Sequence, residues 1–144
     1  MEENPRISFC KEGLQYRVQS QGQVVKWLSM VAKEEGKAFG GLSIILCTDS
    51  YLVKINHKYL KTNTLTDVIA FDYGDSKTIS GDIFISLDRV RENAKKFNVS
   101  VTNELRRVMV HGTLHLIGFS DKTKAGKAEM TQKEDLYLSL FPLK

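Results

Sequence analysis

Short apolar runs alternate with segments of helical periodicity along this chain of 144 residues. The run LSIILC, residues 42–47, has the length of a strand and lacks polar alternation, which is typical of a strand covered on both faces. Before it, Val24, Leu28 and Val31 recur at helical spacing, and Gly36 marks the end of that helix. The alternation indicates an α+β or α/β architecture.

The same patterns place the other elements. Further strands are expected at residues 7–10, 67–74 and 81–86, the last two separated by the turn-rich segment GDSKTISG. Helices are expected at residues 23–37, 51–60, 87–98, 102–118 and 125–141. Ser100 is a good N-cap for the fourth helix, and Glu104 lies in its first turn, where an acid favours the helix dipole. We therefore expect a single α+β domain spanning residues 1–144, with a small mixed sheet of about four strands packed with about five helices.

Composition and charge exclude several classes of protein. No apolar run approaches the roughly 20 residues of a membrane-spanning helix, and the start MEENPRISFC lacks the basic and apolar regions of a signal peptide. A cytoplasmic protein without a membrane partner is therefore expected. The net charge of +4 and the pI near 9.0 permit an acidic partner such as RNA. Cys10 and Cys47 fit no metal-ligand spacing and are expected to be reduced thiols in the core.

The segment HGTLHLIGFSD, residues 111–121, has the spacing of a metal site. Positions i and i+4 of a helix project from one face, so His111 and His115 can direct two imidazole nitrogens at one point. Gly118 falls where a helix commonly ends, so the chain can fold back and bring the Asp121 carboxylate to that point. Three protein ligands with one open position are typical of catalytic zinc, which lowers the pKa of a bound water towards about 7. The alternative is a pair of helix-surface histidines without a metal, which the added glycine and acid disfavour.

The residue after His111 discriminates between kinds of hydrolysis. A zinc peptidase of the H-E-x-x-H type needs a glutamate there as its general base, and this chain has Gly112. Peptide hydrolysis is therefore disfavoured, although the spacing imitates the longer H-x-x-x-H-x-x-G-x-x-H pattern of such peptidases. No residue of the motif identifies a general base.

At these residues the sequence resembles the YbeY family of bacterial metal-dependent endoribonucleases. The family signature is H-G-x-L-H-L-x-G-(Y/F)-D-H, and it is matched at His111, Gly112, Leu114, His115, Leu116, Gly118 and Phe119. INHKYLKTNTLTDVIAFDYG and SGDIFIS resemble two further family stretches, L-N-x-x-(Y/F)-R-x(5)-T-(D/N)-V-L-S-F and L-G-D-I-x-I-S. The resemblance implies that His111 and His115 are catalytic through one Zn²⁺ ion, with Asp121 in place of the third histidine ligand; carboxylate is an acceptable zinc ligand.

The resemblance also implies a function and partners. The expected activity is zinc-dependent, single-strand-specific endoribonuclease action in ribosomal RNA maturation and ribosome assembly. Ribosomal RNA is the expected partner, together with ribosomal proteins or the assembling small subunit. The rival hypothesis is a non-catalytic ribosome-assembly protein that binds RNA and holds a structural zinc.

One departure from the family favours that rival. The family carries an arginine, a candidate phosphate contact, where this chain has Leu60, and Lys61 follows it. Lysine keeps a positive charge but lacks the planar fork that binds a phosphate through two hydrogen bonds. Arg107, one helical turn before His111, is a second candidate for that contact, and its alternative is a solvated surface arginine.

Other polar residues have functional and ordinary explanations side by side. Asp82 could accept a hydrogen bond from the free N–H of a ligand histidine or serve a turn. His57 could contact RNA or lie on a helix surface. Basic residues could form an RNA groove or solvated faces; they are Arg89, Arg91, Lys95, Lys96, Lys122, Lys124 and Lys127.

Overall fold

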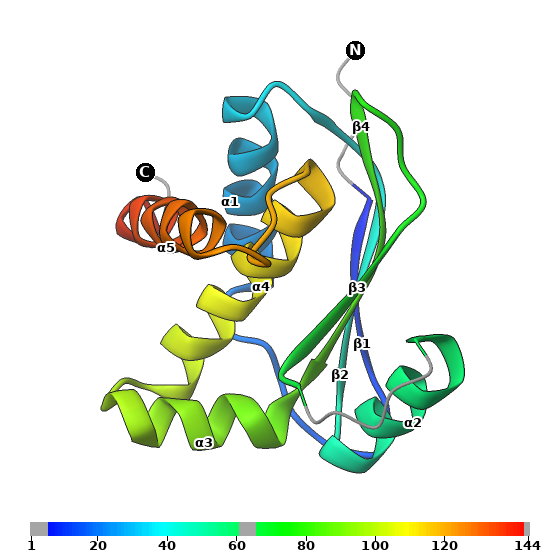
Figure 1. Ribbon diagram of the computed structural model, residues 1–144. Coiled ribbons are helices and arrows are strands. Elements are labelled where there is room, and N and C mark those ends of the chain that lie inside the picture. The colour runs from blue at the N-terminus through cyan, green and yellow to red at the C-terminus, as the bar shows by residue number, and fades with distance from the viewer. Residues whose placement is uncertain (1–5, 61–65, 143–144) are drawn as a thin grey trace.

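The computed structural model describes residues 6–60 and 66–142, which form four strands and five helices around one sheet (Figure 1). The strands are β1 (Ile7–Lys11), β2 (Ala38–Cys47), β3 (Val68–Asp72) and β4 (Thr78–Ser86). The helices are α1 (Gln21–Glu34), α2 (Asp49–Leu60), α3 (Leu87–Phe97), α4 (Val101–Ile117) and α5 (Lys124–Ser139). These elements confirm the expected α+β fold with a small mixed sheet.

The sheet has the strand order β1-β2-β4-β3. Strand β2 pairs in parallel with β1 and with β4, whereas β3 pairs antiparallel with β4. Since β2 lies inside the sheet, its second half is buried almost throughout, as the uninterrupted apolar run of residues 42–47 predicts. Strand β3 forms one edge of the sheet.

Two strands begin earlier than the sequence pattern indicates. The ladder between β2 and β4 continues back to Ala38 and Thr78, with an irregularity between Phe39 and Gly41. The first four residues of β2 are exposed or partly exposed and include two glycines, and the first three of β4 contain one buried apolar residue, Ile79. Neither strand start therefore carries an apolar run of the kind that identifies the buried halves. Pairing with a neighbouring strand, rather than local pattern, extends the two strands.

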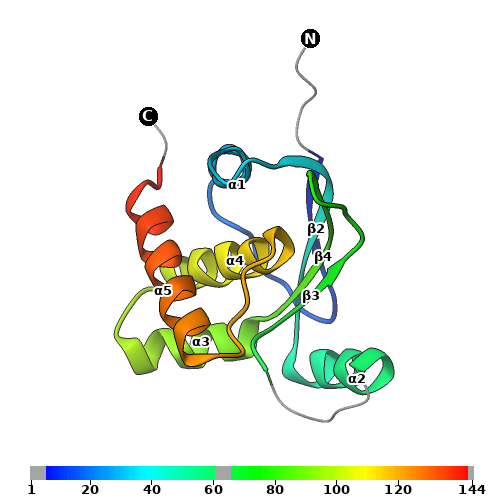
Figure 2. The same cartoon turned by 45° about the horizontal axis from the view of Figure 1, so that its top comes forward.

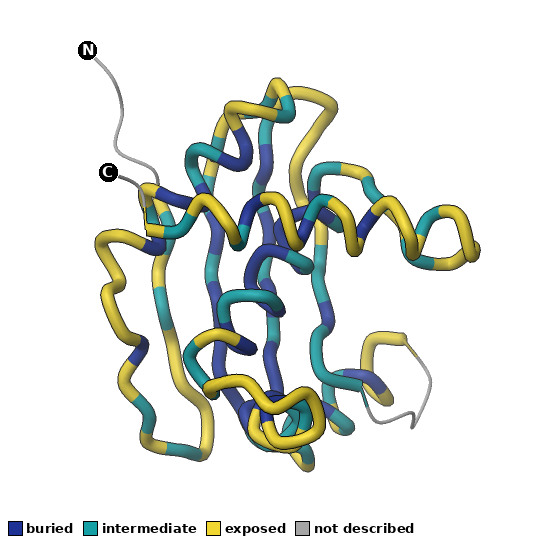
Figure 3. The backbone as a smooth tube through the Cα atoms, turned by 90° about the vertical axis from the view of Figure 1, so that its left-hand side faces the viewer, coloured by how far each residue is buried: buried dark blue, intermediate teal, exposed yellow. Residues whose placement is uncertain are grey.

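The helices divide unequally between the two faces of the sheet (Figures 1 and 2). Helices α1, α3, α4 and α5 lie on one side and share the main hydrophobic core, in which Trp27, Ile83 and Leu114 are completely buried. Helix α2 lies on the opposite side, over a separate small cluster made of Cys47, Leu52 and Ile69. In Figure 3 the most buried backbone is in the strands behind the helices.

Helix α4 lies between the sheet and α5, so it is buried for most of its length (Figure 2). Its predicted cap is confirmed, because the Ser100 hydroxyl accepts a hydrogen bond of 3.0 Å from the backbone N–H of Asn103. Gly112 faces β4 closely: a Cβ atom there would lie 2.8 Å from Cγ2 of Ile83. A residue without a side chain thus sets how near α4 approaches the sheet.

The two cysteines differ in environment. Both thiols are free, Cys47 being buried beside α2 and Cys10 being exposed on β1. The expectation of a core thiol is therefore wrong for Cys10, because it lies on the exposed side of the edge strand β1. Among the described residues, none of the helices has the length and hydropathy needed to span a membrane.

Candidate metal centre

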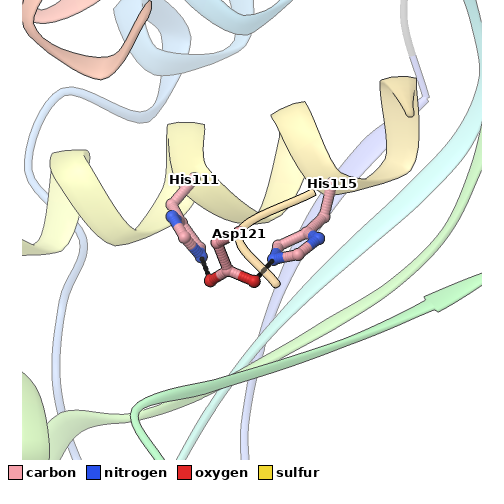
Figure 4. A group of neighbouring side chains, drawn as sticks. All are labelled: His111, His115 and Asp121. Atoms are coloured by element: carbon pink, nitrogen blue, oxygen red, sulfur yellow. Dashed lines mark ion pairs between the residues drawn. The ribbon is translucent and has the colours of Figure 1, made fainter. Parts of the chain in front are cut away.

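Three side chains that the motif predicts as ligands lie together at the end of α4 (Figure 4). His111 and His115 project from the helix, and Asp121 comes from the loop that follows it. One ligand atom from each of the three lies within 4.8 Å of the others. Nε2 of His111 lies 3.5 Å from Oδ2 of Asp121, and Nε2 of His115 lies 3.6 Å from Oδ1. The carboxylate therefore faces both imidazoles.

The end of α4 brings the carboxylate into this position. The helix stops at Gly118, whose φ of 125° lies in a region that residues with a side chain rarely adopt. The backbone N–H groups of Gly118 and Phe119 both donate to the carbonyl oxygen of Leu114, at 3.1 and 3.0 Å. The chain thus turns back, and Asp121 reaches the histidine face before Thr123 caps α5.

Glu134 contacts His111 on the side of the ring away from Asp121, and the sequence analysis did not identify it. Its Oε2 atom lies 2.6 Å from Nδ1 of His111, and its side chain is only 9% exposed. Glu134 comes from α5, where it lies between the buried residues Met130 and Tyr137. An acid at helical spacing within an apolar stripe is unusual. That signal was available in the sequence.

The two histidines differ in their proton affinity. Burial lowers the pKa of His111, whereas the hydrogen bond and charge of Glu134 raise it, as do the charges of Asp67 and Asp121. The net effect is a pKa above that of a free histidine. Burial and the neighbouring His111 lower the pKa of His115, against a smaller opposing effect of Asp121. His115 is therefore the histidine that is more readily neutral, which is the form that binds a metal.

A cavity of about 590 Å³ opens beside the three side chains. It follows the edge strand β3 and is lined by Asn56, Leu60, Thr66, Asp67, Val68, Ile69, Ala70, Asp72, His111, His115, Leu116, Asp121 and Lys122. Its volume falls within the range of about 300–1,000 Å³ that is typical of ligand sites. The ligand side chains are partly exposed, at 20% for His111, 33% for His115 and 38% for Asp121. A metal held by them would keep one side open to this cavity.

The position of the family arginine and the alternative candidate Arg107 lie in different places. Leu60 lines the cavity and is 52% exposed, whereas Lys61 lies outside the described residues. Arg107 does not line the cavity; its guanidinium donates to Oε1 of Glu134 at 3.0 Å and to Oδ1 of Asp135 at 2.7 Å. The arginine is thus held by two acids of α5.

The remaining candidates are spread over the surface. Asp82 accepts a hydrogen bond of 3.1 Å from the hydroxyl of Tyr73, and no ligand histidine is its partner within residues 6–60 and 66–142. His57 is exposed on α2 and is not part of the cavity lining. Of the basic residues, Lys122 lines the cavity, and Arg89 forms an ion pair of 3.2 Å with Asp49.

Comparisons with known proteins bear on the same residues. The sequence profile of the family described as Endoribonuclease YbeY matches residues 8–141. The chain is 46% identical over 138 residues to Endoribonuclease YbeY of Flavobacterium psychrophilum, covering 96% of this chain and 98% of that protein. It is 44% identical over 135 residues to the protein of the same name from Cytophaga hutchinsonii, covering 93% and 94%. The solution structure of TM1509 from Thermotoga maritima superposes with a TM-score of 0.64 at 27% identity, covering 92% of this chain and 87% of that one.

Proposed function

The chain belongs to the Endoribonuclease YbeY family, and on that premise we propose that it cleaves ribosomal RNA at a zinc ion held by His111, His115 and Asp121. The enzyme is an endoribonuclease, a hydrolase of RNA phosphodiester bonds. The observation that carries the proposed site is the convergence of three ligand atoms within 4.8 Å on the wall of an open cavity. Each of the three comes from a motif position that the family signature marks.

The chemistry of the donors supports zinc. Two imidazole nitrogens and one carboxylate oxygen are ligands that zinc accepts, and three protein ligands with an open side are the usual catalytic arrangement. Nδ1 of His111 is already engaged by Glu134, so its Nε2 atom is the one directed at His115 and Asp121. The described residues thus fit the ion without rearrangement of α4.

The residues around the cavity have separate tasks in hydrolysis. Zinc held by the three ligands would act as a Lewis acid and would lower the pKa of a coordinated water. Lys122 places a positive charge on the cavity wall, where it can pair with a phosphate oxygen. Asp67, whose charge raises the pKa of His111, is a carboxylate outside the ligand set that can accept a proton from the attacking water. The apolar wall at Leu60 leaves room for a ribose or base.

Charge supports RNA as the substrate and the metal as a requirement. The net charge of +4 favours a polyanion. Within the described lining, however, Lys122 is the one cation beside Asp67, Asp72 and Asp121. A phosphate entering this cavity therefore needs the metal charge to offset the acids. The proposed partners are ribosomal RNA and, in the cytoplasm, ribosomal proteins or the assembling small subunit, bound by one YbeY-like domain.

One observation favours the second candidate, a non-catalytic assembly protein with a structural zinc. Leu60 places an apolar side chain on the cavity wall where the family resemblance implies a phosphate-binding arginine. A zinc peptidase has no such support, because Gly112 packs against Ile83 and leaves no space for a glutamate.

Asp121 provides the test of the ligand set. Purified protein should contain about one zinc per chain and should cleave single-stranded RNA until a chelator is added. Asp121→His should retain zinc, since imidazole is as good a donor as a carboxylate. Asp121→Ala should bind zinc more weakly, because only two protein ligands remain. Elemental analysis and competition with a chromogenic chelator measure both effects.

Two results would contradict this scheme. Equal zinc affinity in Asp121→Ala and the unaltered protein would remove Asp121 from the ligands. Salt-dependent RNA binding without metal-dependent scission would establish the assembly protein instead, because binding needs only charge whereas scission needs the open metal position.

A change at Leu60 tests the missing phosphate contact. Leu60→Arg should raise the single-turnover cleavage rate by about a hundredfold, because one well-placed charge-assisted donor contributes a few kcal/mol to a transition state. Leu60→Lys, which adds the charge without the fork, should give a smaller increase. An unchanged rate in both variants would show that an arginine at this position does not reach the reacting phosphate.

A further inference from the structure

We infer that Glu134 is a positioning residue that fixes His111 in the tautomer whose Nε2 lone pair faces His115 and Asp121. Arg107 in turn holds Glu134 in the orientation that this requires. The inference deepens the metal site and rests on the proposed function for its consequence, although the tautomer itself can be observed without any metal.

The contact between Glu134 and His111 determines the site of the imidazole proton. A carboxylate only accepts hydrogen bonds, and Oε2 of Glu134 lies 2.6 Å from Nδ1 of His111. The proton of a neutral imidazole must then be on Nδ1, which leaves the lone pair on Nε2. That same Nε2 atom lies 3.5 Å from Oδ2 of Asp121. The Nδ1 proton of the ring thus points to Glu134, and the Nε2 lone pair, which can bind a metal, points to the proposed ion.

Arg107 holds the other oxygen of the same carboxylate. Its Nη1 donates to Oε1 of Glu134 at 3.0 Å, and its Nη2 donates to Oδ1 of Asp135 at 2.7 Å. The guanidinium therefore joins α4 to two successive acids of α5. Because Glu134 is 9% exposed and has partners on both oxygens, its carboxylate has little freedom to turn away from His111.

Asp135 provides a control that distinguishes two roles of Glu134, the positioning of His111 and the attachment of α5 to α4. Both acids bind Arg107 and both can attach α5 to α4, but of the two only Glu134 contacts a histidine ring among the described residues. Asp135 is 60% exposed, so its replacement by asparagine should leave the core unchanged. An effect on His111 that follows loss of Glu134 and not loss of Asp135 is therefore an effect of positioning. Carboxylate partners of this kind typically change metal affinity by about 10–100-fold.

The experiment reads the tautomer in the metal-free protein. Long-range ¹H–¹⁵N spectra at mildly alkaline pH report which ring nitrogen carries the proton, and the chain has only three histidines to assign. The unaltered protein and Asp135→Asn should show His111 with its proton on Nδ1. Glu134→Ala should populate the Nε2–H form. Glu134→Gln, whose amide oxygen still accepts a hydrogen bond, should restore the Nδ1–H form.

Zinc affinity of the same variants gives the consequence for the site. Competition with a chelator should show a loss of about 10–100-fold in Glu134→Ala, a smaller loss in Glu134→Gln and almost none in Asp135→Asn. A His111 proton on Nε2 in the unaltered protein, or the same tautomer with and without Glu134, would overturn the inference. The expected tautomers in a protein that binds no zinc would instead overturn the proposed function and leave the role of Glu134 standing. Circular dichroism of each variant confirms that the comparison is made between folded proteins.

Discussion

His115→Ala should abolish RNA cleavage and sharply reduce zinc binding while leaving the protein folded. The His115 side chain is one-third exposed and its Nε2 atom faces Asp121, so its removal opens no cavity in the core. The site would keep only two ligands, and the lost Lewis acid is worth several kcal/mol in the transition state. We therefore expect single-turnover cleavage to fall by about a thousandfold or more.

The same variant should bind RNA nearly as well as the unaltered protein. Its affinity should still fall steeply with salt, because contacts of phosphates with lysines and arginines outside the cavity do not depend on the metal. His57→Ala is the matched control: this histidine is exposed on α2 outside the cavity lining, and its loss should change neither zinc content nor cleavage. Cleavage that persists in zinc-depleted His115→Ala would show that the reaction takes place elsewhere on the chain.

Gly112→Glu should destabilise the protein by about 4 kcal/mol or more, which is enough to unfold many domains of this size. A Cβ atom at this position would lie 2.8 Å from Cγ2 and 3.0 Å from Cδ1 of Ile83, which is completely buried in the main core. The glutamate would add both an overlap and an unpaired carboxylate between α4 and β4. The midpoint of urea unfolding measures the loss.

Gly22→Ala is the control for a helical glycine without neighbours. In the part of the chain that the structure describes, nothing beyond the adjoining backbone of α1 lies within 4 Å of a Cβ atom at Gly22. Alanine should therefore stabilise the protein by up to about 1 kcal/mol through its helix propensity. A Gly112→Glu protein as stable as the unaltered one would mean that α4 does not pack on β4 as closely as the structure has it. Peptidase activity in Gly112→Glu would contradict the conclusion that this fold has no space for the glutamate of a zinc peptidase.

Local pattern was sufficient for much of the fold and for the three proposed ligands. Periods of two and 3.6 residues place the strands and helices, and the spacing from His111 through Gly118 to Asp121 depends only on helix geometry and one turn. All three side chains come from a continuous stretch of α4 and its following loop. Neighbouring residues in the sequence determine short-range geometry of this kind, so it can be predicted without the fold.

Contacts between distant elements could not be obtained in the same way. The bond between Glu134 and His111 joins residues 23 positions apart on two helices, and nothing local to either residue specifies that α5 crosses α4 there. The same limit applies to Arg107, whose guanidinium could be assigned to solvent or phosphate until the acids of α5 were placed beside it. The early starts of β2 and β4 also depend on pairing between strands.

Because α2 lies alone on the far face of the sheet, the two sides of the cavity are held by different hydrophobic clusters. The half with the proposed ligands is built on α4 and shares the main core, whereas Asn56 and Leu60 belong to a helix held over Cys47, Leu52 and Ile69. Local unfolding needs less free energy where fewer apolar contacts must be broken. We therefore expect the side of the cavity formed by α2 to open locally at a lower free energy than the side formed by α4, which holds the proposed ligands.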